Sequence, residues 1–200
     1  MSGMNEHLGA AVAAGMESKK NERLRRLEKC LWPQGFRRDT WMVVDGARDP
    51  RIRPLLRELH LEHYCLYRGQ LPPALEAAAP YLVQLDPDDP ETRRFLGQAW
   101  GNSWGIFLKC GAHANTLRRH LREFLVVRDP DGNRLVFRYY DPRVLRIFLP
   151  TCTAGELREL FGPIDVFWVE DERPDTVLEF GCDQTGLIGR RIDLANDAGL

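Results

Sequence analysis

The sequence predicts an α/β fold: a mixed, partly parallel β-sheet flanked by helices, with a small C-terminal extension. Short apolar runs alternate with segments whose apolar residues recur at helical spacing, which is typical of βαβ units with parallel strands. The motif Asp-Pro-Asp-Gly at residues 129–132 lies between two β-branched runs and predicts a hairpin, and therefore an antiparallel pair. With 200 residues and 44% apolar side chains, the chain is long enough for one domain with a sizeable core.

The predicted strands are short apolar runs that end at a glycine, a proline or a charged residue. In chain order they are residues 40–45 (TWMVVD), 62–67 (EHYCLY), 81–86 (YLVQLD), 104–110 (WGIFLKC), 124–128 (FLVVR), 134–140 (RLVFRYY), 164–169 (IDVFWV) and 176–180 (TVLEF).

The predicted helices repeat leucine and other apolar residues every three or four positions. In chain order they are residues 19–31, the segment opened by Asp49 and Pro50, and residues 72–79, 91–100, 115–124, 143–148 and 153–161. Thr153 and Glu156 match the spacing of a capping box at the start of the last of these helices.

The predicted domain organisation has three parts. Residues 1–18, rich in alanine and glycine, are expected to be a flexible N-terminal tail. Residues 19–170 form the α/β domain, and residues 171–200 form a short C-terminal extension that is acidic and irregular.

Composition limits the partners. The net charge is −1, so we expect no long-range attraction to nucleic acid or to a membrane surface. Arginine makes up 24 of the 28 basic residues; genome composition explains this most simply, although arginine is also favoured at protein interfaces. The 5 cysteines are widely spaced without a CxxC pair, no export signal is recognisable, and the longest uncharged run is too short for a membrane span. We therefore expect a soluble, cytoplasmic protein.

Two cysteine–histidine pairs are weak candidates for chemistry. Cys110 and His113 have the spacing of half a metal site, but no second half follows. His63 and Cys65 share a face of a predicted strand, but no orienting acid or oxyanion hole can be recognised beside them. Structural roles explain both pairs more simply, and we predict no metal and no cofactor.

Three aspartates, Asp45, Asp86 and Asp141, stand at the ends of predicted strands. Ligands often gather at the carboxyl ends of strands in α/β sheets, and acidic trios can hold magnesium. Turn initiation and helix capping explain the same residues more simply. A hydrolase or nucleotide-acting enzyme that uses these aspartates is therefore the alternative function.

Residues 120–150 are the most informative segment. Arg138 and Tyr140 would share one face of the predicted strand, while Tyr139 points to the other face. Asp141, followed by proline, would cap a helix whose first turn contains Arg143, where the helix dipole disfavours a cation. Either arginine could pair with Asp141 or with a carboxylate of a partner, and the sequence leaves both possibilities open.

Several segments together resemble the type VI secretion effector adaptor/chaperone family (Tap/Tec-like proteins, which share a domain of unknown function). The matching segments are residues 41–47 (WMVVDGA), 66–86 (LYRGQLPPALEAAAPYLVQLD), 105–110 (GIFLKC), 120–150 and 160–164 (LFGPI). The resemblance implies a cytoplasmic protein that is not an enzyme. It implies that the protein binds a secreted toxin effector and loads it onto the VgrG spike protein or its PAAR tip.

The residues predicted to form the motif or to bind partners lie within these segments. They are Asp45, Arg68, Tyr81, Arg138, Tyr140, Asp141 and Arg143. No catalytic, cofactor-binding or metal-binding residue is predicted.

Overall fold

The computed structural model describes residues 2–33, 39–129 and 131–196. A large sheet is built from strands β1 (Thr40–Asp45), β2 (His63–Cys65), β3 (Pro80–Gln84), β4 (Gly105–Lys109), β7 (Val166–Glu170), β8 (Thr176–Asp183) and β9 (Gly186–Asp193). Strands β5 (Val126–Arg128) and β6 (Arg134–Val136) form a separate hairpin. The helices are α1 (Ser2–Leu31), α2 (Ile52–Glu58), α3 (Pro73–Ala77), α4 (Pro90–Ala99), α5 (Ala114–Glu123), α6 (Pro142–Phe148) and α7 (Ala154–Phe161), with a 3-10 turn at Leu149–Thr151. Among the described residues, no helix combines the length and hydrophobicity that a membrane span requires.

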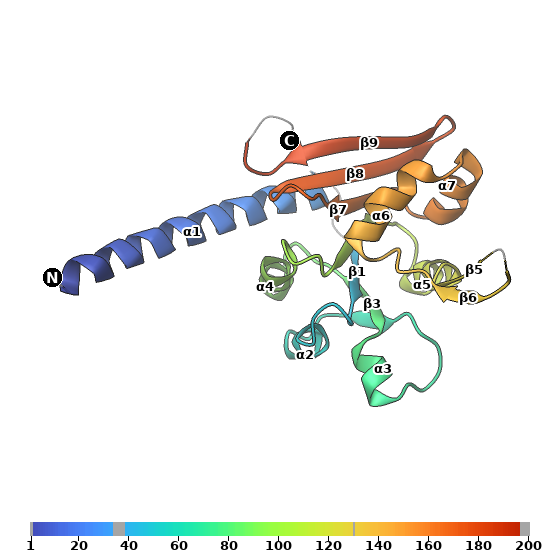
Figure 1. Cartoon of the computed structure of the whole chain (residues 1–200), viewed down its shortest axis with the longest axis horizontal. Coiled ribbons are helices and arrows are strands. Elements are labelled where there is room, and N and C mark those ends of the chain that lie inside the picture. The colour runs from blue at the N-terminus through green and yellow to red at the C-terminus, as the bar shows by residue number, and fades with distance from the viewer. Residues whose placement is uncertain (1, 34–38, 130, 197–200) are drawn as a thin grey trace.

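The prediction of a partly parallel sheet is wrong. The strand order is β2-β3-β1-β4-β7-β8-β9, and each neighbouring pair in the described sheet is antiparallel. The α/β alternation is nevertheless real, and Figure 1 shows helices on both sides of the sheet.

The position of β3 and β1 explains the error. Helix α2 connects β1 to β2, which run in the same direction, but β3 lies between them and is antiparallel to both. Helix α4 likewise connects β3 to β4, and β1 lies between those two strands. Each crossover helix therefore joins co-directional strands, as in a βαβ unit, while the inserted strand makes every ladder antiparallel.

The sheet separates two layers of core. On one face, Met42 and Val44 of β1 pack with buried residues of α1, α2 and α4. On the other face, Trp41 and Val43 pack with buried residues of α5, α6 and α7. All residues of β1 are buried, as expected for a central strand covered on both faces. Toward its N-terminus, α1 extends away from this body (Figure 1).

The predicted hairpin is present, but its second strand is shorter than expected. The turn uses Gly132 at φ +85°, a conformation that glycine adopts without strain. Strand β6 ends at Val136, so the expected alternation does not reach Tyr139 and Tyr140, and both tyrosines are buried in the same core layer. The prediction that they point to opposite faces is therefore wrong.

The predicted domain boundaries stay a prediction. Helix α1 covers all but the first residue of the range 1–18, and residues 197–200 lie outside the described residues. Within the range 171–200, β8 pairs with β7 and β9 pairs with β8, which makes both strands part of the large sheet. Strand β9 was not predicted, because its exposed edge position lacks an apolar pattern.

Candidate functional site

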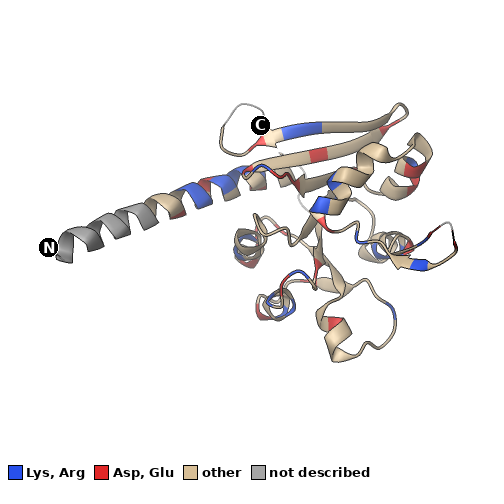
Figure 2. Ribbon diagram, viewed as in Figure 1, with Lys and Arg blue, Asp and Glu red and all other residues tan. Residues whose placement is uncertain are grey.

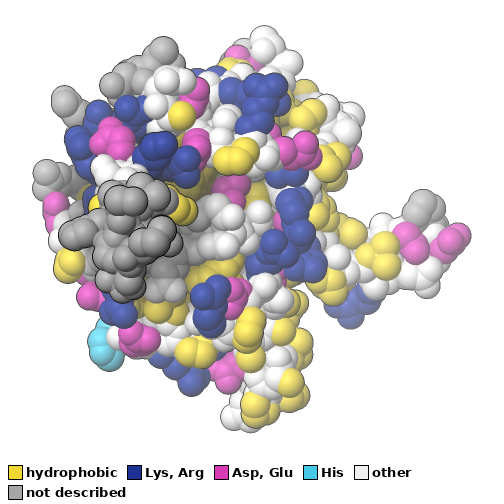
Figure 3. Space-filling model, turned by 60° about the vertical axis from the view of Figure 1, so that its left-hand side comes forward, with side chains coloured by type: hydrophobic (Ala, Val, Ile, Leu, Met, Phe, Trp, Pro, Cys, Tyr) yellow, Lys and Arg dark blue, Asp and Glu magenta, His cyan; other side chains and the backbone are white. Residues whose placement is uncertain are grey.

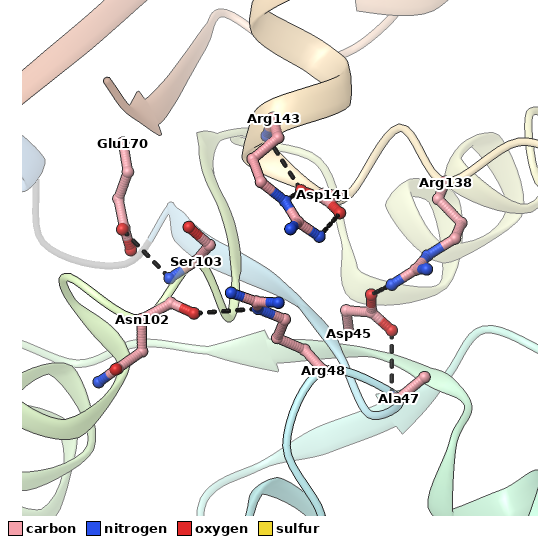
Figure 4. Close-up of polar contacts among 9 residues, drawn as sticks. All are labelled: Asp45, Ala47, Arg48, Asn102, Ser103, Arg138, Asp141, Arg143 and Glu170. Carbon is pink, nitrogen blue, oxygen red and sulfur yellow. Dashed lines mark hydrogen bonds and ion pairs between the residues drawn. The ribbon is translucent and has the colours of Figure 1, made fainter. Parts of the chain in front are cut away.

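Asp45, Arg138, Asp141 and Arg143, here called the motif cluster, lie together at one end of the sheet, where β1 and β7 end and β4 begins (Figure 4). Asp45 is the last residue of β1, and its side chain is buried. One carboxylate oxygen accepts a hydrogen bond from the backbone N–H of Ala47 at 3.1 Å, and the other pairs with the guanidinium of Arg138. Asp45 thus closes the turn after β1 and holds the segment that leads into α6.

A second pair lies beside the first. Asp141 caps α6 by accepting a hydrogen bond from the N–H of Arg143 at 3.0 Å. The Arg143 side chain returns to the same carboxylate, with Nε at 2.9 Å and Nη2 at 2.6 Å. Burial alone would raise the pKa of Asp141, but the hydrogen bonds from Arg143 outweigh it and the pKa lies below its usual value. The carboxylate therefore stays charged and satisfies both the helix end and the guanidinium.

Both arginines present part of their surface to solvent while their partners do not. The side chains of Arg138 and Arg143 are 43% and 46% exposed, against 2% for Asp45 and 5% for Asp141. Hydrogen bonding to Asp45 raises the pKa of Arg138, and Asp141 adds to the effect. Two buried carboxylates thus fix two guanidinium groups whose outer sides remain available to a partner.

The other predicted residues lie apart from this cluster, except Tyr140. The Tyr140 side chain is buried near Tyr67, and burial raises its pKa, with Asp45 contributing. Tyr81 is buried on β3, where its hydroxyl donates to the carbonyl of Glu76 at 2.6 Å. Arg68 is exposed on a different surface, beside the β5–β6 hairpin.

The candidates for enzyme chemistry do not assemble. Asp45 lies opposite Pro80 at the start of β3, whereas Asp86 follows the end of β3. The two aspartates therefore lie at opposite ends of the strands. Within the described part of the chain, no group of three or more Asp, Glu, His or Cys residues has metal-binding geometry.

The two cysteine–histidine pairs have structural surroundings. His63 contacts the carbonyl of Leu61 through Nδ1 at 2.6 Å and the guanidinium of Arg53 through Nε2 at 3.1 Å, so both ring nitrogens are engaged. With the proton on Nδ1, neither nitrogen is left to activate the Cys65 thiol. Cys110 is buried, and burial raises the pKa of its thiol, which disfavours the thiolate that a metal or a nucleophile requires.

A cavity of about 810 Å³ lies next to the motif cluster. Its walls come from α1, the turn between α4 and β4, the start of α6 and the β7–β8 turn, and they include Arg143, Arg146 and Glu170. Figure 3 shows basic, acidic and apolar side chains interspersed on the face from which α1 projects. Figure 2 likewise shows both signs of charge spread over the elements, in keeping with the small net charge.

Glu170 was not predicted from the sequence, and among the acids at this end of the sheet its pKa departs most from the usual value. It is 7% exposed; Oε2 accepts from the N–H of Ser103 at 3.2 Å, and Oε1 has no hydrogen-bond partner among the described residues. Burial raises its pKa to about 7. The available signal was its position: an acid that is the last residue of a buried strand, as with Asp45.

In this cluster two buried carboxylates, Asp45 and Asp141, position two arginines, Arg138 and Arg143, at one end of a sheet that is covered by helices on both faces. The chain belongs to the family described as domain of unknown function (DUF4123), which matches residues 40–159. This family is associated with type VI secretion effector adaptors. No curated protein and no solved structure matches the chain.

Proposed function

We propose that the chain is a cytoplasmic adaptor that binds a type VI secretion effector and loads it onto the VgrG or PAAR spike. The family match carries this proposal, since it spans β1 to α7 and includes all the predicted motif residues. The protein would act by binding and release, without turning over a substrate.

The arrangement of Arg138 and Arg143 supports a binding role. Each guanidinium is already oriented by a buried carboxylate, so a partner carboxylate would meet a donor with little side-chain freedom left to lose. Arginine is among the residues enriched at the energetic hot spots of protein interfaces. We assign the exposed sides of these arginines to a partner's acidic residues.

The alternative enzyme has little support from the same residues. An aspartate-based site would need Asp45 and Asp86 close together, and the antiparallel pairing of β1 with β3 separates them. Asp45 and Asp141 are also occupied by hydrogen bonds to arginine. Structural roles for these acids are sufficient.

Affinity purification from the native host tests the proposal. The tagged chain should recover one effector and a spike protein, identified by mass spectrometry, and deletion of its gene should abolish secretion of that effector. An effector of the same host that does not co-purify serves as control and should still be secreted. Equal abundance and secretion of the co-purifying effector in the deletion strain would refute the adaptor role.

A further inference from the structure

The β5–β6 hairpin exposes apolar side chains on both of its faces. Val126 pairs with Val136 and Val127 pairs with Leu135. Successive residues of a strand point to opposite faces, so each face carries one of these pairs. All four side chains are at least 39% exposed, and Val136 reaches 60%. In Figure 1 the hairpin projects on the opposite side of the molecule from α1.

One face of the hairpin borders a groove of about 600 Å³. Leu66, Leu71 and Leu75, from the segment that runs from β2 into α3, line its other side. Leu75 is 45% exposed, so the apolar surface continues from the hairpin onto α3. Contiguous apolar surface of this kind marks an interaction site more often than scattered exposed residues do.

The charged residues that line the groove are all basic: Arg68, Arg122 and Arg134. Arg122 fixes the segment that forms one wall of the groove, because its guanidinium donates hydrogen bonds to the backbone carbonyls of Leu66 at 2.8 Å and Tyr67 at 2.9 Å. Arg68 and Arg134 are exposed, and within the described part of the chain neither forms an ion pair. Figure 2 shows basic positions on both β6 and the loop before α3. A partner that complements this groove must bring acidic groups.

The hairpin also offers backbone hydrogen bonds. In the described structure β5 and β6 pair only with each other, so each strand keeps one unpaired edge. An exposed edge with apolar side chains accepts an added strand from another chain, and main-chain hydrogen bonds then give affinity while alternate side chains give specificity.

We infer that this hairpin groove, formed by β5, β6 and residues 66–75, binds an extended acidic segment of the effector. Aliphatic side chains of the segment enter the groove between Leu75 and Val136, and Asp or Glu residues on the same face of the segment pair with Arg68 and Arg134. The inference rests on the proposed function, because it assigns the segment to the effector. In this assignment the effector binds the hairpin groove, and the spike binds the separate motif cluster that contains Arg138 and Arg143.

Synthetic peptides test the chemistry without the effector. A fluorescent peptide whose odd positions alternate between valine and aspartate, with serine at the even positions, presents both kinds of side chain on one face. It should bind the full chain, and added salt should weaken the binding. A peptide of equal length with lysine in place of aspartate should not bind. Equal binding of the two peptides would overturn the inference.

Variants locate the binding surface. Val136→Ser and Arg134→Ala should each weaken peptide binding by about tenfold, as expected for residues at the centre of a small interface. Ile188→Ser, at a position 52% exposed on β9, is the matched control and should bind as the wild type does. Circular dichroism of each variant verifies the fold. Unchanged binding by both hairpin variants would place the peptide elsewhere and refute the assignment.

Effector recovery by the same variants distinguishes this inference from the proposed function. If the wild type and Val136→Ser recover the effector equally, the groove assignment is wrong and the adaptor role stands. If the wild type recovers no effector, the adaptor role fails, and peptide binding still decides the chemistry of the groove. A wild-type dimer that Val136→Ser converts to a monomer would show that a second copy of the chain covers the groove, against the inference.

Discussion

Substitution of Glu170 by glutamine should change how stability depends on pH. Glu170 is 7% exposed, and burial raises its pKa from 4.5 to about 7. Between these values the folded protein holds a proton that the unfolded chain has released, so stability falls as pH rises through this window. The full loss is on the order of 3 kcal/mol, from about 1.4 kcal/mol for each pKa unit of the cited shift. Glu170→Gln cannot ionise and should lack this loss.

Urea unfolding, followed by tryptophan fluorescence, measures the effect. As the pH is raised from about 5 to about 8, the free energy of unfolding of Glu170→Gln should rise relative to that of the wild type by on the order of 3 kcal/mol. The difference between the two pH values isolates the ionisation from any packing change that the amide introduces. Glu172→Gln is the matched control, since the Glu172 side chain is 75% exposed, and it should show no such gain. A stability difference for Glu170→Gln that is the same at both pH values would refute the reasoning.

Three further predictions concern the motif cluster and α7. Asp45→Asn should lower the free energy of unfolding by about 1–2 kcal/mol, because Arg138 loses its charged partner; unchanged urea unfolding would contradict this. Arg143→Ala should weaken spike binding in pull-downs while stability changes by no more than about 1 kcal/mol, since the side chain is 46% exposed. A large loss of stability with binding retained would show that the Asp141 pair is only scaffold. Thr153→Ala should cost about 1 kcal/mol in urea unfolding through loss of the capping box of α7, and no change would show that the cap contributes nothing.

Local sequence signals predicted most elements of this fold. The run TWMVVD is strand β1 at the expected residues, and the capping box of Thr153 and Glu156 begins α7 as expected. Whether neighbouring strands are parallel was not predictable in the same way. It depends on whether another strand inserts between the two strands that a crossover helix joins. That choice is made by packing between distant segments, and no short pattern of residues records it.

The candidate site shows the same division between local and distant contacts. Asp141 was expected to cap a helix, and the structure shows this cap. Whether an arginine pairs with Asp141 or with a partner was left open by the sequence, and in the structure Arg143 pairs with Asp141. Arg138 instead pairs with Asp45, which is 93 positions away in the chain, and proximity in sequence gave no hint of this. Glu170 escaped notice because its perturbed pKa arises from burial by several elements rather than from its neighbours in sequence.

The single pairing between β4 and β7 has a consequence for how the chain is assembled during synthesis. Strands β1 to β4 are contiguous in the chain and pair among themselves, and β7 joins them through three register pairs with β4. On the ribosome, one edge of β4 therefore stays open while α5, the hairpin, α6 and α7 emerge. An uncovered edge of this kind is prone to wrong pairing with other nascent chains until residues 166–170 arrive to cover it. The segment matched by the family model ends before β7, so the strand that covers this edge lies outside the matched residues.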